Sequence, residues 1–341
     1  MKSQVPSVPL PAKLSRIMDG LIVHQALYVA AKLGVADLLA GDPRPITELA
    51  GQLDVNESAL HRILRALASQ GVFEETNPGV FANTELSEFL CTGVPSSIRS
   101  MLILRGSEFF YAPFGEILYS VQTGKSARAR MHGMDGFEYL KTHPEQARVF
   151  DDAMTDISKL AGPAVAMAYD FGAWGRVMDI GGGNGMLLAA VLNAHSQLDG
   201  VLADLPHVLE RARQRGFLGG ELEARSAFEA CDFFREVPSG CRAYMLKSVI
   251  HDWDDEASLT ILTNCRRVVP NDGVLLLVEY PIPEGNLPSA GKLTDIVMMV
   301  LTGGRERTLQ QYRLLLGAAG FRFNQVYPTS ADFVIIEAMP A

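Results

Sequence analysis

One histidine stands where a parallel sheet would hold its ligands. The segment "KSVIHDWDDE" follows a predicted strand, so we expect His251 at the carboxyl end of that strand, the edge at which open α/β sheets bind ligands. An imidazole with an ordinary pKa near ~6.5 can accept a proton at neutral pH, which makes His251 a candidate general base. Glu279 ends the next strand, in "LLLVEY", at the same edge, where a carboxylate could stabilise an imidazolium.

A glycine-rich turn lies upstream of this histidine, in "RVMDIGGGNGMLLAAVL". A strand, a glycine run and a helix in this order bring the backbone close to a nucleotide-like ligand. Gly181 and Gly183 have the start of a dinucleotide fingerprint, but Met186 stands where its last glycine belongs, which disfavours a nicotinamide oxidoreductase. Asp179, before the glycines, suits an amino-bearing or cationic ligand. Asp204, at the end of the next strand, can accept both hydroxyls of a ribose.

The elements that would position these residues alternate between strand and helix from Trp174 onward. Such alternation predicts a doubly wound, mostly parallel sheet, and the short link between the last two strands predicts an antiparallel edge hairpin. Thr308 and Gln311 fit a capping box at the last helix. The predicted strands are 176–180, 200–204, 222–226, 242–247, 273–279, 321–327 and 333–338, and the helices include 185–194, 206–215, 255–267 and 309–319.

The N-terminal part has a different character, and we predict two domains, 1–100 and 101–341. Residues 14–93 show the helices and β-wing of a winged helix, with Thr47 and Asn56 as helix caps and a turn at Asn77-Pro78-Gly79. Residues 101–172, rich in aromatics and methionine, predict a helical layer over the Rossmann-like core of residues 173–341.

The composition narrows the classes of partner. The net charge is −9 and the winged helix has no basic footprint, so a DNA-binding regulator with a sensing Rossmann half is disfavoured. The helices predicted at 14–40 carry more apolar surface than a single hydrophobic core would cover, which favours a subunit interface over a membrane span. No histidine or cysteine pair has metal-ligand spacing, so we expect no metal, and the four cysteines are expected to be reduced in a cytoplasmic protein.

Five blocks in order carry a family resemblance: "VMDIGGGNGMLLAAVL", "ADLPHVLERA", "CDFFREVP", "LKSVIHDWDDEASLTIL" and "GGRERTLQQYRLLLGAAGF". They resemble the class I S-adenosylmethionine-dependent small-molecule O-methyltransferases, typified by plant caffeate and flavonoid enzymes and by bacterial antibiotic-pathway relatives. The resemblance covers nearly the whole chain. It implies a homodimer formed through the N-terminal domain, a small aromatic acceptor, and S-adenosylhomocysteine as the second product.

The resemblance also implies a set of cofactor contacts. The glycine loop would pass the methionine moiety, Asp204 would hold the ribose, and Asp232 with Phe233 would flank the adenine, although the family usually has Met at the position of Phe233. Lys247 matches a cofactor position or is a strand-end lysine that reaches for solvent. The full implied set is Asp179, Gly181, Gly183, Asp204, Leu205, Asp232, Phe233, Lys247, Trp253 and Ser158.

The resemblance implies catalysis by His251, braced by Glu279 and Glu306, with Asp252 as a supporting residue. The alternative for Glu306 is a surface ion pair with one of its arginine neighbours. Phe150, Met154, Val297 and Met298 would line the acceptor pocket, which suits a flat polycyclic phenol. Methylation of a ring nitrogen, which needs no base, stays open as an alternative.

Overall fold

The computed structural model describes residues 9–94 and 96–341. They form two compact units that divide between Tyr111 and Ala112. The division follows α8 rather than residue 100 because the preceding helix α7 packs on α2. Gly106 of α7 lies so close to Tyr28 of α2 that a Cβ atom there would be 2.3 Å from its side chain.

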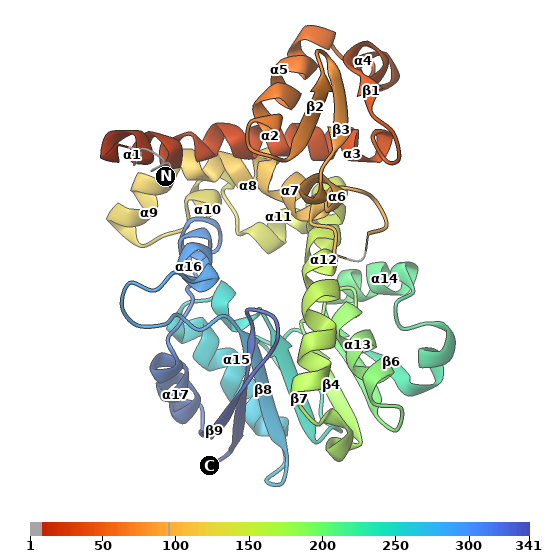
Figure 1. Ribbon diagram of the computed structural model, residues 1–341. Coiled ribbons are helices and arrows are strands. Elements are labelled where there is room, and N and C mark those ends of the chain that lie inside the picture. The colour runs from red at the N-terminus through yellow and green to blue at the C-terminus, as the bar shows by residue number, and fades with distance from the viewer. Residues whose placement is uncertain (1–8, 95) are drawn as a thin grey trace, which may run out of the picture. The chain divides into compact units, whose positions relative to one another are not determined.

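The N-terminal unit is helical with a small three-stranded sheet, in the strand order β1-β3-β2 (Figure 1). Its helices are α1 (Leu10–Met18), α2 (Gly20–Leu33), α3 (Val35–Leu38), α4 (Ile46–Leu53), α5 (Glu57–Ala68), α6 (Glu85–Glu88), α7 (Arg99–Gly106) and α8 (Glu108–Tyr111), and its strands are β1 (Arg44–Pro45), β2 (Phe73–Asn77) and β3 (Val80–Asn83). The predicted wing is therefore present, and β1 adds a short strand that the sequence pattern did not indicate.

The two predicted helix caps in this unit have different outcomes. The Asn56 Oδ1 atom accepts a hydrogen bond from the Ala59 amide (2.9 Å), and α5 buries Leu60 and Leu64 behind this cap. The prediction for Thr47 is wrong, because α4 already begins at Ile46, after Pro45 in extended conformation. The backbone before that helix is held in β1, so the helix starts earlier than the side-chain pattern indicates.

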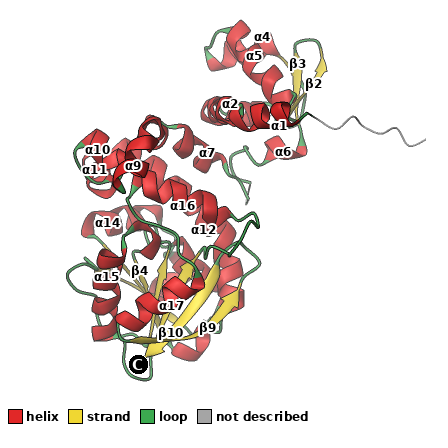
Figure 2. Ribbon diagram, turned by 90° about the vertical axis from the view of Figure 1, so that its left-hand side faces the viewer, coloured by secondary structure: helices red, strands yellow, loops and turns green. Residues whose placement is uncertain are grey.

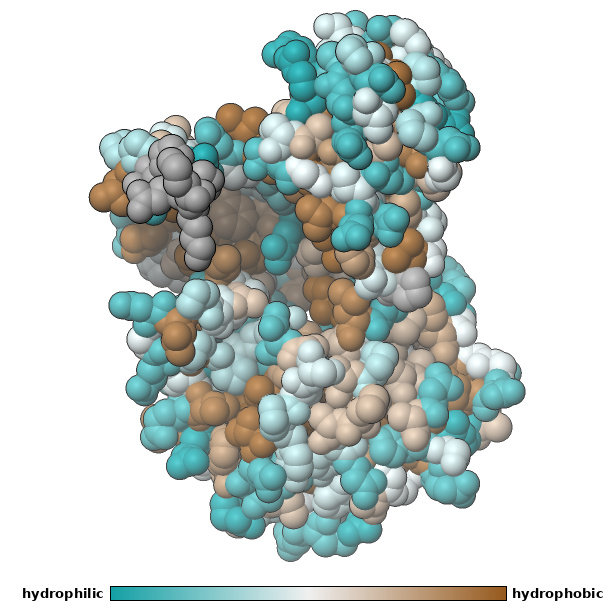
Figure 3. Space-filling model, in the orientation of Figure 1, coloured by the Kyte–Doolittle hydropathy of each residue, from teal (hydrophilic) through white to brown (hydrophobic). Residues whose placement is uncertain are grey.

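The first two helices leave a hydrophobic face uncovered. In α1 and at the start of α2, Leu10, Leu14, Ile17, Met18 and Ile22 each expose two thirds or more of their surface. Figure 3 shows hydrophobic residues at the upper left, where Figure 1 places α1. Among the described residues, no helix combines the length and the apolar character that a bilayer span requires.

The C-terminal unit is a seven-stranded sheet with helices on both faces (Figure 2). Its strands are β4 (Arg176–Ile180), β5 (Asp199–Asp204), β6 (Ser226–Ala230), β7 (Ala243–Lys247), β8 (Val274–Glu279), β9 (Phe321–Pro328) and β10 (Val334–Pro340). Its helices are η1 (Ala112–Glu116), α9 (Ile117–Thr123), α10 (Ala127–His132), α11 (Gly136–Thr142), α12 (Pro144–Ala168), η2 (Phe171–Trp174), α13 (Met186–Ala194), α14 (Pro206–Arg215), η3 (Gly220–Arg225), η4 (Ile250–Asp252), α15 (Asp255–Val268), α16 (Ala290–Leu301) and α17 (Leu309–Ala318).

The strand order is β6-β5-β4-β7-β8-β10-β9. The first five strands are parallel, and β10 pairs antiparallel with both β8 and β9. This confirms the doubly wound sheet with an antiparallel edge hairpin. The capping box at Thr308 and Gln311 is also confirmed, since each side chain accepts a hydrogen bond from the backbone amide of the other residue.

One predicted strand is displaced. Residues 222–225 belong to the short helix η3, and the edge strand β6 runs over 226–230 instead. Gly220 adopts a positive φ of 63° and starts the helical turn, which buries Leu222. The apolar residue that suggested a strand is therefore part of the helix packing.

Alternate residues of the strands point to opposite faces and form two separate cores. Val177, Leu202 and Met245 pack under α12 and α13. Met178, Val201 and Leu246 pack under α15 and α17 on the other face. Since both faces are covered, the central strands β5, β7 and β8 are apolar along most of their length, and their charged residues lie at the strand ends, where a site can form.

Candidate active site at the carboxyl edge of the sheet

The glycine loop follows β4, and its backbone lies close to the neighbouring strand β5. The Gly181 amide donates to Ala203 O (2.7 Å) of the neighbouring strand, and Gly181 and Gly183 have positive φ angles of 68° and 59°. A Cβ atom at Gly181 would be 3.0 Å from Val249 and 3.5 Å from the Phe233 ring. Glycine is therefore needed there both for its backbone conformation and for space.

Asp204 ties this loop to the end of β5. One carboxylate oxygen accepts from the Gly183 amide (2.9 Å) and the other from the Leu205 amide (2.7 Å). Burial raises the pKa of Asp204 to about 6, against the opposing effect of these two amides. The carboxylate is thus fixed in direction beside the glycine loop, and each oxygen keeps a lone pair for a further donor.

Asp179 and Lys247 form a buried pair of opposite charges below the loop. Asp179 is 1% exposed, and neither of its carboxylate oxygens has a hydrogen-bond partner among the described residues. Burial raises the pKa of Asp179 to about 7, and burial lowers that of Lys247 to about 8, each against the attraction of the other charge. The Lys247 ammonium also lies 4.8 Å from the centre of the Phe333 ring. The half-buried lysine thus lies near the Phe333 ring and within the field of Asp179.

Aromatic rings form one side of the same edge. The Trp253 ring lies 6.3 Å from Phe233 and 4.6 Å from Phe234, centre to centre. Asp232 begins this turn, and its Oδ1 atom accepts a hydrogen bond from the Phe234 amide (3.1 Å). A flat ring system could lie against this wall with a carboxylate at its rim.

His251 and Glu306 make the shortest polar contact of this edge. The His251 Nδ1 atom lies 2.6 Å from Glu306 Oε1, and both side chains are buried. A carboxylate oxygen is an acceptor, so Nδ1 must carry a proton, and in the neutral imidazole the lone pair is therefore on Nε2. Arg305 and Arg307, the alternative partners of Glu306, both reach Asp255 instead.

Two further acids surround the imidazole. Glu279 Oε2 is 3.9 Å from His251 Nδ1, and Asp252 Oδ1 is 3.9 Å from Nε2. Burial alone would lower the pKa of His251, but Asp252, Glu279 and Glu306 outweigh it and raise this pKa to about 9. The base is therefore stronger than the ordinary imidazole assumed from the sequence.

Residues that the sequence analysis missed hold the loop of Glu306 in place. The Arg307 guanidinium, 1% exposed, donates to Ile250 O (3.0 Å) and Trp253 O (2.9 Å) on either side of His251. The Glu306 amide donates to Asp295 (2.9 Å), and a Cβ atom at Gly304 would be 2.2 Å from His251 O. The only sequence signal for this contact is the paired glycine before the charged run.

His251, Glu279 and Glu306 also bring three possible metal ligands within 4.8 Å of one another. A metal at Nδ1 would have to replace the proton that the short contact with Glu306 requires. Because imidazole binds metal through a free lone pair, the arrangement fits a braced base better than a metal centre.

The comparisons with known proteins agree with this geometry. Residues 114–322 match the O-methyltransferase domain and residues 15–93 match the O-methyltransferase dimerisation domain. Phenazine O-methyltransferase PhzM of Lysobacter antibioticus is 43% identical over 98% of this chain and 97% of its own. The chain belongs to the S-adenosylmethionine-dependent O-methyltransferases.

Solved structures of family members have the same fold. The structure of LaPhzM superposes with a TM-score of 0.93 at 43% identity, over 98% of this chain and all of that one. NcsB1, an O-methyltransferase from neocarzinostatin biosynthesis solved with S-adenosylmethionine and 2-hydroxy-5-methyl naphthoic acid, superposes with a TM-score of 0.84 at 31% identity, over 99% of this chain and all of that one.

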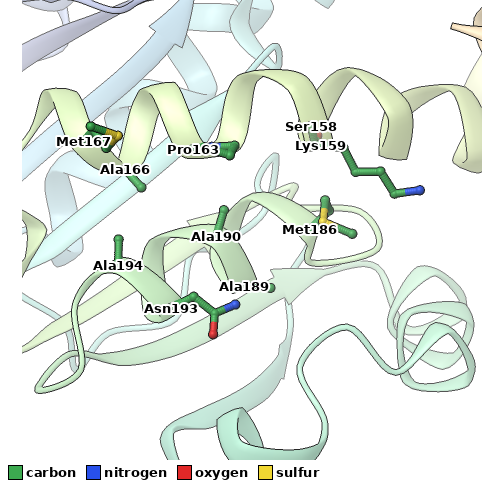
Figure 4. A pocket seen from close by; sticks show the side chains of 10 residues that line it. All are labelled: Ser158, Lys159, Pro163, Ala166, Met167, Met186, Ala189, Ala190, Asn193 and Ala194. Carbon is green, nitrogen blue, oxygen red and sulfur yellow. The ribbon is translucent and has the colours of Figure 1, made fainter. Parts of the chain in front are cut away.

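The residues at the edge of this methyltransferase fit its cofactor chemically. S-Adenosylmethionine carries an amino group, a ribose and an adenine, and the site offers a partnerless carboxylate at Asp179, the fixed carboxylate of Asp204, and the aromatic wall at Phe233. Ser158 is placed differently from these residues. It lines a groove of about 500 Å³ between α12 and α13, where Figure 4 shows Pro163 and Met186.

The predicted acceptor residues come from two helices of the layer over the sheet. Phe150 and Met154 lie on α12, half-buried, and the Phe150 ring meets the edge of the Phe137 ring at 6.2 Å. Val297 and Met298 lie on α16, which ends just before the loop that carries Glu306. Both helices thus border the residues that surround His251.

Proposed function

We propose that this enzyme transfers the methyl group of S-adenosylmethionine to a hydroxyl of a small polycyclic phenol, with His251 as the general base. The observation that carries the proposal is the 2.6 Å contact of Nδ1 with Glu306, which makes Nε2 the nitrogen that accepts a proton once the imidazole is neutral. The cofactor supplies a methyl group on a sulfonium, which is a ready electrophile. The protein then has to align the acceptor and remove its proton.

The acids around His251 match its basicity to a phenol. Its pKa of about 9 lies closer to the ~10 of a phenol than that of an ordinary imidazole does. Glu306 orients the ring and, with Glu279, stabilises the imidazolium that forms when the hydroxyl proton reaches Nε2. Asp252 lies on the Nε2 side, where the accepted proton arrives. The imidazole must be neutral before it can act, so activity should rise with pH.

The cofactor residues keep the roles that the family resemblance implies. Asp204 would accept the ribose hydroxyls, Asp232 and Phe233 would flank the adenine, and Asp179 would meet the amino group. The support is the fixed direction of the Asp204 carboxylate and the burial of the Asp179 carboxylate without a hydrogen-bond partner among the described residues. Lys247 would contribute through Asp179, and Trp253 through the ring that it packs on Phe233.

We also infer that the enzyme is a homodimer through its N-terminal unit. The match to a dimerisation domain and the uncovered apolar face of α1 and α2 support this inference. Replacing Leu14 and Ile17 with Glu should convert the dimer to a monomer in analytical ultracentrifugation. A dimer that survives this change would place the interface elsewhere.

N-Methylation is the competing reaction, because one relative, 34% identical, is an 8-amino-8-demethylriboflavin N,N-dimethyltransferase. An amine acceptor needs no base to remove a proton before transfer. The buried, braced histidine therefore favours a hydroxyl acceptor, and the dependence of turnover on His251 separates the two reactions.

Calorimetric titration with S-adenosylmethionine and with NADH tests the class of cofactor. We expect only the sulfonium to bind, and Asp204→Ala to weaken that binding by about 10- to 100-fold, the range of a lost hydrogen bond to a charged group. Asp199→Ala, at the exposed start of the same strand, is the matched control. A panel of naphthols, screened by mass for the gain of one methyl, then tests the acceptor. Equal binding by wild type and Asp204→Ala would remove the ribose assignment.

A further inference from the structure

An arginine that belongs to none of the roles above is buried beside the proposed acceptor pocket. Arg128, in the first turn of α10, is only 6% exposed. The start of α10 is fixed by Ser126, whose hydroxyl accepts from the Ala129 amide (3.0 Å) and lies 2.9 Å from Leu301 O at the end of α16. The arginine backbone is therefore anchored to one of the helices that border the site.

The fold makes space for this guanidinium at Gly136. A Cβ atom there would be 2.1 Å from Arg128 Nη2 and 2.4 Å from Cζ, so a larger residue would displace the head group. The next residue, Phe137, packs its ring on Trp253 (5.8 Å between centres) and on Phe150 (6.2 Å). The guanidinium thus lies against the residue that precedes Phe137, whose ring belongs to the aromatic group that would hold a flat acceptor.

Charge links Arg128 to the catalytic histidine. Burial lowers the pKa of Arg128 to about 10, and Asp252 and then Asp135 oppose this effect. Asp252 is also the acid that lies 3.9 Å from His251 Nε2, the atom that would receive the acceptor's proton. The guanidinium is therefore within electrostatic reach of the place where the acceptor hydroxyl must lie.

We propose that Arg128 is a specificity-determining residue that binds a carboxylate on the aromatic acceptor. The inference rests on the proposed function and adds the class of acceptor, a phenol that carries an acidic group. A guanidinium has five N–H donors in a fixed fork, a geometry that matches the two oxygens of a carboxylate. A buried cation beside aromatic rings is complementary to a hydroxylated aromatic acid and not to a neutral hydrocarbon.

The test compares hydroxynaphthoates with naphthols that carry the hydroxyl at the same ring position. For the wild type, we expect at least one hydroxynaphthoate to exceed its naphthol in kcat/KM by about 10- to 100-fold, the range of a charged hydrogen-bonded pair. Arg128→Met should bring this ratio close to one, mainly through KM, and Arg128→Lys should restore part of it. Arg130→Met, on the exposed side of the same helix, is the matched control and should leave the ratio unchanged.

The outcomes separate this inference from the proposed function. Methylation of naphthols with no preference for any hydroxynaphthoate would overturn the role of Arg128 and leave the methyltransferase reaction standing. A ratio that survives Arg128→Met, with both acceptors slowed equally, would show that Arg128 acts through Asp252 or the fold alone, and would also overturn it. Methylation of neither class of acceptor would overturn both proposals.

Discussion

The sheet buries carboxylates in two places, and their surroundings differ. Glu337, in β10, is 6% exposed and accepts hydrogen bonds from the Tyr169 hydroxyl (2.7 Å), the Tyr327 hydroxyl (3.4 Å) and the Asn324 amide. Both oxygens of this carboxylate therefore accept hydrogen bonds from neutral side chains of the fold. Tyr169 is held there in turn by the Trp174 indole (3.0 Å).

The acids at the carboxyl edge are buried without such a complement. Among the described residues, both oxygens of Asp179 and one oxygen each of Glu279 and Glu306 have no hydrogen-bond partner. Burial raises the pKa of Asp179 and that of Glu279 each to about 7. The fold supplies hydrogen-bond donors to Glu337 but not to these oxygens. This indicates that a ligand or a transferred proton would form the missing hydrogen bonds.

The largest effect should follow from removing the base at this edge. His251→Asn should lower kcat with a phenol by about 10²- to 10⁴-fold, the usual contribution of a general base, because the variant loses the group proposed to accept the hydroxyl proton. His195→Asn is the control, since His195 follows the last residue of α13, and its ring contacts Ala166 O (3.1 Å) and Phe171 at the end of that helix away from the glycine loop. A loss below tenfold in His251→Asn would favour an acceptor that needs no base.

The next effect concerns Glu337, the acid whose oxygens are fully hydrogen-bonded. Glu337→Gln should lower the free energy of unfolding by about 1–3 kcal/mol, because the amide nitrogen would face hydroxyl and amide donors. Urea denaturation measures the loss, and kcat at a temperature where the variant is folded should match the wild type. A marked fall in kcat without loss of stability would mean that Glu337 is not purely structural.

A smaller effect appears as a change in pH dependence. Because the pKa of His251 is raised to about 9, kcat/KM for a phenol should rise with pH up to that value in the free enzyme. Glu306→Gln removes a negative charge from Nδ1, so the apparent pKa should fall by about 1–2 units. An unchanged profile in this variant would separate Glu306 from the titrating group.

The raised pKa of His251 also makes the stability of the fold depend on pH. The folded pKa of His251 lies above the ordinary 6.5, so its contribution to stability is fully present below pH 6.5 and is lost as the pH rises through about 9. Bound S-adenosylmethionine would place its sulfonium cation near His251 and lower the pKa of the imidazole. The pH profile of kcat should therefore lie at lower pH than that of kcat/KM.

The contrast between the two places also shows how far the sequence alone could lead. Asp204, His251 and Glu279 could be assigned to one edge because each ends or closely follows a strand in a chain that alternates strand and helix. Asn56 was predictable as a cap because a cap depends on its near neighbours. These predictions rest on local patterns and on the topology that the patterns dictate.

The rest depends on packing between distant segments. Arg307 reaches the backbone on both sides of His251, and Arg128 fits against Gly136, but neither contact has a periodic signal. The edge strand was misplaced at 222–226 because Leu222 is apolar for a helical turn rather than for a strand. The cofactor role of Ser158 follows from the resemblance alone and stays a prediction; this residue lines the groove between α12 and α13.

The smallest effect we predict is a gain. The pKa of Asp179 is raised to about 7, so its ionised form costs stability as the pH rises from about 3.8 to 7, and Asp179→Asn removes that cost. The lost attraction to Lys247 offsets part of the benefit, so we expect a gain of only ~1 kcal/mol at pH 8 and none at pH 4. Thermal unfolding at both pH values, without cofactor, measures it, and the affinity for S-adenosylmethionine should fall in the same variant. Opposite signs for Asp179→Asn and Glu337→Gln would show that the edge gives up stability for binding; a loss of stability in both would mean that Asp179 and Lys247 hold the sheet together, as Glu337 does.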